Sequence, residues 1–324
     1  MTPAQALWLK GKERAEFREE ELPPLGEGEV RIRSRFGAIS RGTEALVFRG
    51  AVPQSEYATM RAPLQHGDFP FPVKYGYAVV GTIVSGPEAR LGETVFCLHP
   101  HQDVFDAPGQ MAISLPASVP PARAMLAANM ETAVNGIWDA GILPGDRVAV
   151  VGGGLVGLLA AYLAAGIPGT EVTVVDVNDD RRRLAEIFGC GFIKAVEAQS
   201  SPGDRDVVIH TSASGAGLAT AISLAGFEAR IVEMSWYGER MSDVPLGGRF
   251  HSQRLSIICS QVGHVPPNRR SRWPLSRRMA KALELLADNR LDTLISGETA
   301  FYDLDRDYAS ILANPSTLCH RIRY

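Results

Sequence analysis

Three glycines near the middle of the chain, Gly152, Gly154 and Gly157, have G-x-G-x-x-G spacing in VAVVGGGLVGLLAAYLAAG. An apolar run that predicts a buried strand precedes them, and a helical pattern follows. In such a turn one glycine permits the sharp bend, the second lets the backbone approach a pyrophosphate, and the third lets helix and strand pack closely. The N-terminus of the helix then offers N–H groups to the phosphates. The stretch therefore predicts a dinucleotide-binding turn.

An acidic residue strengthens this prediction. Asp176 ends the next predicted strand, VTVVD, about twenty residues after the glycines, where a carboxylate can bond the ribose hydroxyls of NAD. The 2′-phosphate of NADP would meet this charge and those of Asp179 and Asp180, although the cation Arg181 is close. We therefore expect NAD as the cofactor, with NADP still possible. A glycine turn that serves only packing is the alternative.

The elements around the turn indicate two domains. A chain of 324 residues is longer than one ordinary core requires. Short alternating runs separated by proline and glycine make residues 1–121 a β-rich domain. Strands and helices alternate over residues 122–263, which predicts the doubly wound parallel sheet of a Rossmann domain. Residues 264–324 contain one clear helix, SRRMAKALELLADNR, and mixed structure. The predicted fold class is α/β with an additional β-rich domain.

Composition excludes several classes of function. The net charge of −3 gives no reason to expect nucleic acid or an anionic membrane as a partner. Four scattered cysteines without CxxC spacing fit a reducing cytoplasm and argue against a disulfide scaffold or a cysteine-cluster zinc site. The first residues lack the apolar core of a signal peptide, and the most apolar stretch is too short to cross a bilayer. We expect a cytoplasmic protein.

The β-rich first part, the Rossmann unit and the segments RGTEALVFRG, GDRVAVVGGGLVG and DVNDDR resemble the medium-chain dehydrogenase/reductase superfamily, the group around the zinc alcohol dehydrogenases. The resemblance covers nearly the whole chain. It implies a GroES-like catalytic domain that is split around the Rossmann domain, so that residues 264–324 return to it, and an active site between the two. It also implies an NAD(P)-dependent oxidoreductase with a small-molecule substrate.

The ligands of catalytic zinc in that superfamily are missing here. In GYAVVG, Tyr77 and Ala78 stand at the His and Glu of the G-H-E-x-x-G motif. Ser40 or Arg41 stands at the cysteine position, and Glu131 is the only donor in the third ligand region, LAANMETAVNG. The four-cysteine structural lobe is absent as well. Catalytic zinc takes three Cys, His or carboxylate ligands, so we predict no metal site.

Without zinc, hydrogen-bond donors can still hold a carbonyl oxygen and deliver a proton. Thr43 matches the Ser/Thr of the family that bonds the substrate oxygen, although it could instead cap the following helix. Tyr77 could donate to the substrate or simply fill the vacated metal space. His99 and His101, in CLHPHQD, lie where relatives line the substrate pocket, as a solvent-facing or proton-relaying pair. The predicted catalytic residues are Thr43, Tyr77 and His101.

Two aromatic residues complete the implied cofactor site. Trp236 and Tyr237 follow the predicted strand ARIVEMS, where the family meets the nicotinamide end of the cofactor, and they could equally be core or interface aromatics. The resemblance thus implies a cofactor site formed by Gly152, Gly154, Leu155, Val156, Gly157, Asp176, Arg181, Thr211, Trp236 and Tyr237.

A basic run lies in NRRSRWPLSRRMAK. Such a run is usually a solvated face, but together with two nearby arginines it could steer an anionic substrate to the active site. Nucleic-acid binding lacks interleaved aromatics and a known reading module. The residues concerned are Arg249, Arg254, Arg269, Arg270, Arg272, Arg277, Arg278 and Lys281.

We interpret the chain as a zinc-independent NAD(P)-dependent oxidoreductase that exchanges hydride between the cofactor and an alcohol or carbonyl substrate. Two alternatives stay open: reduction of an activated C=C bond, as in quinone and enone reductases, and a nucleotide-binding redox sensor without catalysis. The resemblance also implies a homodimer that pairs through the last strand of the Rossmann domain, LSIICSQVG. This strand is apolar enough to be unfavourable as an exposed edge.

Overall fold

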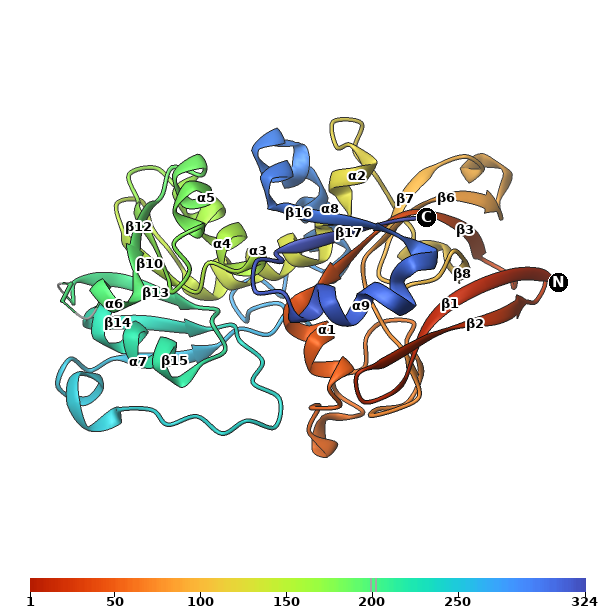
Figure 1. Ribbon diagram of the computed structural model, residues 1–324. Coiled ribbons are helices and arrows are strands. Elements are labelled where there is room, and N and C mark those ends of the chain that lie inside the picture. The colour runs from red at the N-terminus through yellow and green to blue at the C-terminus, as the bar shows by residue number, and fades with distance from the viewer. Residues whose placement is uncertain (199, 202) are drawn as a thin grey trace. The chain divides into compact units, whose positions relative to one another are not determined.

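The computed structural model describes residues 1–198, 200–201 and 203–324, and the chain divides into two compact units (Figure 1). Unit 1 comprises Met1–Ala128 and Leu283–Tyr324, and unit 2 comprises Asn129–Ala282. Unit 1 is mostly antiparallel β-structure and unit 2 contains the parallel sheet. The predicted fold class, a Rossmann domain with a GroES-like β-rich domain, is therefore confirmed.

Unit 2 is built on a parallel sheet with the strand order β12-β11-β10-β13-β14-β15. The chain runs outward from β10 in one direction and from β13 in the other, so the order reverses between these two strands. In an open α/β sheet, ligands bind at this switch point, beyond the carboxyl ends of the strands. The strands are β10 (Arg147–Val151), β11 (Glu171–Asp176), β12 (Gly191–Lys194), β13 (Arg205–His210), β14 (Ala225–Glu233) and β15 (Ser256–Cys259).

Helices connect these strands (Figure 1). Helix α4 follows the glycine turn and buries Leu158, Leu159 and several alanines, because small side chains let it lie close to the valine-rich strands. Among the described residues, no helix combines the length and apolar character needed to cross a membrane. The helices are α3 (Ala127–Ala140), α4 (Leu155–Ala165), α5 (Arg181–Ile187), α6 (Ala195–Ala198), α7 (Gly215–Leu224) and α8 (Leu275–Glu284).

Unit 1 contains two sheets with the orders β2-β1-β5-β4 and β16-β17-β3-β6-β7-β9, and β8 also pairs with β3. The C-terminal strands β16 (Ile295–Ala300) and β17 (Cys319–Arg323) thus complete a sheet that is begun by the first part of the chain (Figure 1). The other strands are β1 (Thr2–Gly11), β2 (Arg14–Leu22), β3 (Glu29–Ser40), β4 (His66–Gly67), β5 (Val73–Lys74), β6 (Val79–Ser85), β7 (Thr94–Cys97), β8 (Val104–Pro108) and β9 (Ile113–Ser114).

The strand β3 places the candidate catalytic residues. It pairs with β6 so that Gly37 lies opposite Val79. Helix α1 (Arg41–Phe48) begins directly after β3, and Tyr77 lies two residues before the start of β6. The other helices of unit 1 include α2 (Pro121–Ala124) and α9 (Leu304–Ala313). The pairing therefore brings the first turn of α1 and the segment around Tyr77 to the same end of the sheet.

Helix α8 remains with unit 2 through most of its length. Arg278 is 1% exposed and pairs with Glu131, with Nε 3.1 Å from Oε1, and it also donates to Asn135. An arginine buried this deeply needs its partners, so α8 is held against α3. The return to unit 1 comes at Leu283, later than the return at residue 264 that was expected from the sequence.

Candidate active site

The three motif glycines face three different constraints. Gly152 has φ of +109°, a backbone conformation that residues other than glycine rarely adopt. A Cβ on Gly157 would lie 1.9 Å from the carbonyl oxygen of Gly152, so no other residue lets α4 pack against the turn. Gly154 begins α4 as its N-cap, and a Cβ there would meet no atom within 4 Å. Open space beside the helix N-terminus fits the approach of a pyrophosphate.

Asp176 ties this turn to the end of β11. Its Oδ2 accepts a hydrogen bond from the N–H of Gly153 at 2.6 Å, and its Oδ1 accepts one from the N–H of Asn178 at 2.7 Å. A carboxylate oxygen can accept more than one hydrogen bond, so Asp176 keeps capacity for a ribose hydroxyl. The residues at this site therefore fit a dinucleotide.

The two arginines that follow Asp176 differ in their surroundings. Arg181 is buried, and its Cβ would lie 3.2 Å from a Cβ on Gly153. Arg182 is exposed and pairs with Asp179 at 2.9 Å, and its guanidinium lies 4.7 Å from the ring centre of Phe192. Arg182 is therefore held by its own neighbours.

The other predicted cofactor residues lie in the same unit. Leu155 and Val156 open helix α4. Thr211 follows β13, and its Oγ1 donates to the carbonyl oxygen of Gly152 at 2.7 Å, which joins β13 to the glycine turn. Tyr237 follows β14 and Trp236 is partly buried beside it. The structure thus brings Thr211 to the glycine turn directly.

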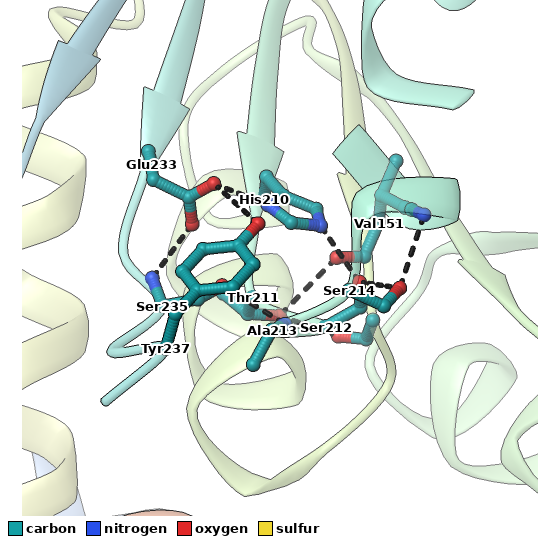
Figure 2. A network of polar contacts seen from close by, with 11 residues as sticks. Val151, His210, Thr211, Ser212, Ala213, Ser214, Glu233, Ser235 and Tyr237 are labelled. Carbon is teal, nitrogen blue, oxygen red and sulfur yellow. Dashed lines mark hydrogen bonds and ion pairs between the residues drawn. The ribbon is translucent and has the colours of Figure 1, made fainter. Parts of the chain in front are cut away.

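Sequence reasoning missed a polar network at the ends of β13 and β14, which Figure 2 shows. His210 is completely buried, and its Nδ1 lies 2.6 Å from Oε2 of Glu233. Its Nε2 lies 2.6 Å from Oγ of Ser212, an exposed residue. Glu233 also accepts hydrogen bonds from the N–H of Ser235 at 2.8 Å and from the hydroxyl of Tyr237 at 3.2 Å. A signal was present, because both strands end in an ionisable residue.

Two of the candidate catalytic residues, Tyr77 and Thr43, lie in unit 1 and are hydrogen-bonded to each other. Burial, with the charge of Glu44, raises the pKa of Tyr77 well above its usual value, although hydrogen bonds with Ser40 and Thr43 act in the opposite direction. The phenol therefore stays protonated at neutral pH. Thr43 lies within the first turn of α1, whose N-cap is Ser40. The alternative that Thr43 caps this helix is therefore wrong.

Glu44, which the sequence prediction omitted, is completely buried behind these residues. Its Oε1 accepts from the N–H of Ser40 at 2.7 Å. Its Oε2 lies 2.8 Å from Nε2 of His101 and accepts from the hydroxyl of Tyr308 at 2.7 Å. A glutamate directly before the apolar run ALVF was the available signal. Because Tyr308 comes from α9, this carboxylate joins three distant segments of unit 1.

His99 and His101 were expected as a solvent-facing or proton-relaying pair. Both are buried, so the solvent-facing alternative is wrong. His99 stacks on Phe105, with ring centres 3.7 Å apart, and His101 bonds Glu44. They follow the end of β7 in an irregular segment, which turns the two rings toward different neighbours.

The residues at the expected zinc positions do not fit the metal. Glu131, the one donor in the third ligand region, is engaged by the buried guanidinium of Arg278. Within the described ranges, no group of three His, Cys, Asp or Glu residues could hold a metal ion. Tyr77, a poor zinc ligand while protonated, stands at the histidine position. The donor set therefore lacks the three ligands that catalytic zinc takes.

The basic run does not form one free surface. Arg278 is buried in unit 2, so it cannot steer a substrate from solution. Several of the others have individual partners: Arg277 lies over Trp273 at 3.9 Å, Arg269 over Trp138 at 5.8 Å, Arg254 pairs with Glu228, and Arg249 donates to the carbonyl groups of Gly203 and Ala225.

Comparisons with known proteins agree with this geometry. The family model "Alanine dehydrogenase/PNT, C-terminal domain" matches residues 124–222. The chain is 25% identical over 291 residues to D-guloside 3-dehydrogenase of Escherichia coli K12. This alignment covers 82% of this chain and 83% of that protein.

Solved structures share the fold along the whole chain. L-idonate 5-dehydrogenase from Escherichia coli superposes with a TM-score of 0.81 at 15% identity, covering 100% of this chain and 99% of that one. An alcohol dehydrogenase from Escherichia coli CFT073, solved with NADH, gives a TM-score of 0.79 at 18% identity and covers both chains completely. The chain is thus similar in sequence to a dehydrogenase along most of its length, and it shares the two-domain fold of these solved dehydrogenases.

Proposed function

We propose that the chain is a zinc-independent oxidoreductase that exchanges hydride between NAD(H) and an alcohol or carbonyl substrate. The observation that carries the proposal is Tyr77, a protonated phenol that is hydrogen-bonded with Ser40 and Thr43 at the position where zinc-dependent relatives have a histidine. A group that donates a hydrogen bond to the substrate oxygen can replace the polarising effect of a metal.

Each catalytic residue has a role that its surroundings support. NAD(H), when bound, exchanges hydride at its nicotinamide ring. Tyr77 donates its hydroxyl proton toward the substrate oxygen, because Ser40 and Thr43 can both donate to the phenol oxygen and leave its proton free. Thr43 holds the phenol in place through this hydrogen bond, which uses the single proton of its hydroxyl. His101 orients this group indirectly, since it fixes Glu44, which in turn holds the first turn of α1.

The donor set supports independence from zinc. Glu131 neutralises Arg278 inside unit 2, and releasing it to bind a metal would leave a buried guanidinium without its partner. Elemental analysis of the purified protein should therefore give no stoichiometric zinc. One zinc per chain that is lost together with activity on chelation would contradict the proposal.

Tyr77→Phe tests the proton donor directly. General acid catalysis typically contributes about 10²–10⁴-fold, so kcat should fall by roughly 100-fold or more while NADH binding persists. Tyr75→Phe is the matched control, because Tyr75 is a buried neighbour whose ring lies 6.1 Å from that of Tyr77. Equal activity of the wild type and Tyr77→Phe would refute the role of the phenol.

The substrate class that we propose is a polyhydroxylated secondary alcohol. The relatives support it through their names, D-guloside 3-dehydrogenase among them. A panel of sugar alcohols and glycosides with NAD should identify substrates by NADH formation. An enone substrate separates the C=C reductase alternative, because its products are a saturated ketone or an allylic alcohol. Tight NADH binding without turnover across the panel would favour the redox sensor instead.

We further propose that the protein is a homodimer in which β15 pairs with its copy. β15 ends the order of the parallel sheet, and its residues Ile257 and Ile258 are only partly buried. An apolar edge strand tends to pair with another strand. Light scattering at micromolar concentration should give twice the chain mass of 35.0 kDa, and a monomeric mass would contradict the proposal.

A further inference from the structure

We infer that Ser212 is an activated nucleophile that forms a covalent acyl intermediate, an activity separate from hydride transfer. Ser212, His210 and Glu233 form a linear chain of hydrogen bonds, with Oγ 2.6 Å from Nε2 and Nδ1 2.6 Å from Oε2 (Figure 2). A serine bonded to an imidazole, with the imidazole oriented by a carboxylate, is the arrangement that activates serine nucleophiles on unrelated folds.

The donors and acceptors fix the direction of these hydrogen bonds. Glu233 already accepts from the N–H of Ser235 and the hydroxyl of Tyr237, and an ionised carboxylate can only accept. The Nδ1 of His210 therefore carries the proton that it shares with Glu233. In neutral His210 the Nε2 is then an acceptor, so the hydroxyl of Ser212 donates to it. This is the tautomer in which an imidazole can take the proton of a serine.

The carboxylate is suited to this role. Burial alone would raise the pKa of Glu233, but its hydrogen bonds with His210 and Ser235 outweigh burial and leave the pKa lowered. Glu233 therefore remains ionised at neutral pH, as the third member of such a chain must be in order to stabilise a protonated imidazole.

The backbone presents the serine to solvent. Ser212 lies between the carboxyl end of β13 and helix α7, and it is exposed while His210 is completely buried. The next residue, Ala213, has φ of +50°, an uncommon conformation for alanine and a sign of a strained turn. A strained strand-to-helix turn at the top of a parallel sheet also presents the nucleophile of the α/β-hydrolases.

The space around the serine is kept open by a glycine in α7. A Cβ on Gly217 would lie 2.0 Å from Oγ of Ser212 and 2.8 Å from Nε2 of His210. Any larger residue would therefore displace the hydroxyl from the imidazole. The first turn of α7 also directs its positive end toward this region, which favours the negative oxygen of a tetrahedral intermediate.

The substrate class is a small activated ester. The Oγ of Ser212 attacks the carbonyl carbon while its proton moves to Nε2 of His210. The ester C–O bond then breaks, and the departing alkoxide receives that proton as an alcohol. Water attacks the acyl-serine with His210 again taking a proton, and the carboxylic acid leaves as Ser212 regains its hydrogen. Each step balances with ester and water as the only reactants.

Sulfonyl fluoride labelling of the full-length protein without added nucleotide tests the inference. Phenylmethylsulfonyl fluoride should add its sulfonyl group to Oγ of Ser212 with loss of fluoride, and peptide mass spectrometry identifies the labelled serine. His210→Asn should slow labelling by about 100-fold. Ser223→Ala is the matched control, since Oγ of Ser223 donates to the carbonyl oxygen of Thr220 within α7, and labelling of Ser212 in this variant should equal that in the wild type.

Two further variants keep the test decisive if His210→Asn does not fold. Gly217→Ala should abolish labelling by displacing the hydroxyl, and Glu233→Gln should slow it by removing the charge that orients the imidazole. Hydrolysis of p-nitrophenyl acetate should follow the same order among the variants. The inference is overturned if Ser212 is labelled no faster than Ser214, or if labelling of Ser212 is unchanged in His210→Asn or Gly217→Ala. A network that only stabilises the strand ends would give this result.

Discussion

Each unit contains a buried histidine that is bonded to a glutamate, and the two pairs differ in what surrounds them. In unit 1, His101 and Glu44 are both completely buried, and the other bonds of Glu44 go to the buried Tyr308 and to a backbone N–H. In unit 2, the pair of His210 and Glu233 continues to an exposed serine at one end. The first pair is closed to solvent and the second is open.

The same two side chains can stabilise a fold where they are enclosed, and they can take part in proton transfer where one end of the pair is exposed. A closed pair cannot exchange a proton with a substrate or water, so its value lies in joining segments. An open pair can pass a proton to the group at its exposed end. His101, which the sequence indicated as catalytic, is therefore best described as a positioning residue. We therefore expect substitutions in the closed pair and in the open pair to have different effects.

The largest difference should appear in stability. Glu44→Ala leaves His101 and Tyr308 buried without their common acceptor, and breaking a buried pair in this way costs about 3–5 kcal/mol. Glu233→Ala should cost less, about 1–2 kcal/mol, because water can reach the exposed end of that network. Hydrogen exchange measured by mass spectrometry reports each unit separately. Equal losses in the two units would contradict the distinction between a closed and an open pair.

The sequence predicted those features that depend on neighbouring residues. The glycine turn is defined within six residues, and Asp176 ends the strand that follows, so both could be placed by spacing alone. Glu44 and its partners could not, because His101 is 57 residues away and Tyr308 is 264 residues away. Only the pairing of β3 with β6 and β17 brings such segments together.

The boundary of the Rossmann unit shows the same limit. The change of sequence pattern after LSIICSQVG suggested that the chain leaves the unit at residue 263. The helix α8 nevertheless packs with unit 2 as far as Ala282, since Arg278 has its partners there. Arg278, which the sequence placed in a basic run, is buried and makes contacts that hold α8 in this unit.

The second prediction isolates one hydrogen bond of the closed pair. Tyr308→Phe removes the hydroxyl that donates to Glu44 at 2.7 Å and keeps the ring against Phe48. A hydrogen bond to a charged group contributes about 1.5–3 kcal/mol, and denaturant unfolding should show a loss in this range. Tyr302→Phe is the matched control, because that exposed hydroxyl donates to Asp103 and its loss should cost less than about 1 kcal/mol.

The third prediction concerns Asp176, a carboxylate that bonds no histidine and that we expect to contact the cofactor. Asp176 bonds the glycine turn and keeps capacity for the ribose. We expect NADH to bind about tenfold more tightly than NADPH, a difference of roughly 1.4 kcal/mol, and Asp176→Ser to remove most of that difference. Calorimetric titration measures both affinities. Tighter binding of NADPH by the unmutated protein would contradict the role of Asp176.

The fourth prediction, with the smallest effect, uses pH to test the open pair. Burial opposes ionisation of Glu233, yet the hydrogen bonds of His210 and Ser235 leave its pKa below the usual 4.5. A carboxyl group whose pKa is lowered by folding stabilises the fold above the pKa of the unfolded chain, and this contribution is lost as pH falls through the lower folded value. Glu233→Gln should therefore be less stable than the wild type by about 1 kcal/mol at pH 7.

Below pH 4.5 the stability difference between the wild type and Glu233→Gln should become smaller, because Glu233 takes up a proton. Denaturant midpoints of the two proteins at several pH values measure this difference. Of the other groups near Glu233, the pKa of Tyr237 is raised to about 12 and that of the Cys259 thiol is raised above 9.0, in both cases chiefly by burial. Neither changes charge in this range, and His210 is the residue that bonds Glu233 through its ring nitrogen Nδ1. The same comparison in a His210→Asn background separates the two, because Glu233 then lacks its main hydrogen-bond partner and the gap should be small at every pH. If the stability difference between the wild type and Glu233→Gln were constant with pH, the stabilising contribution of Glu233 would not depend on its charge.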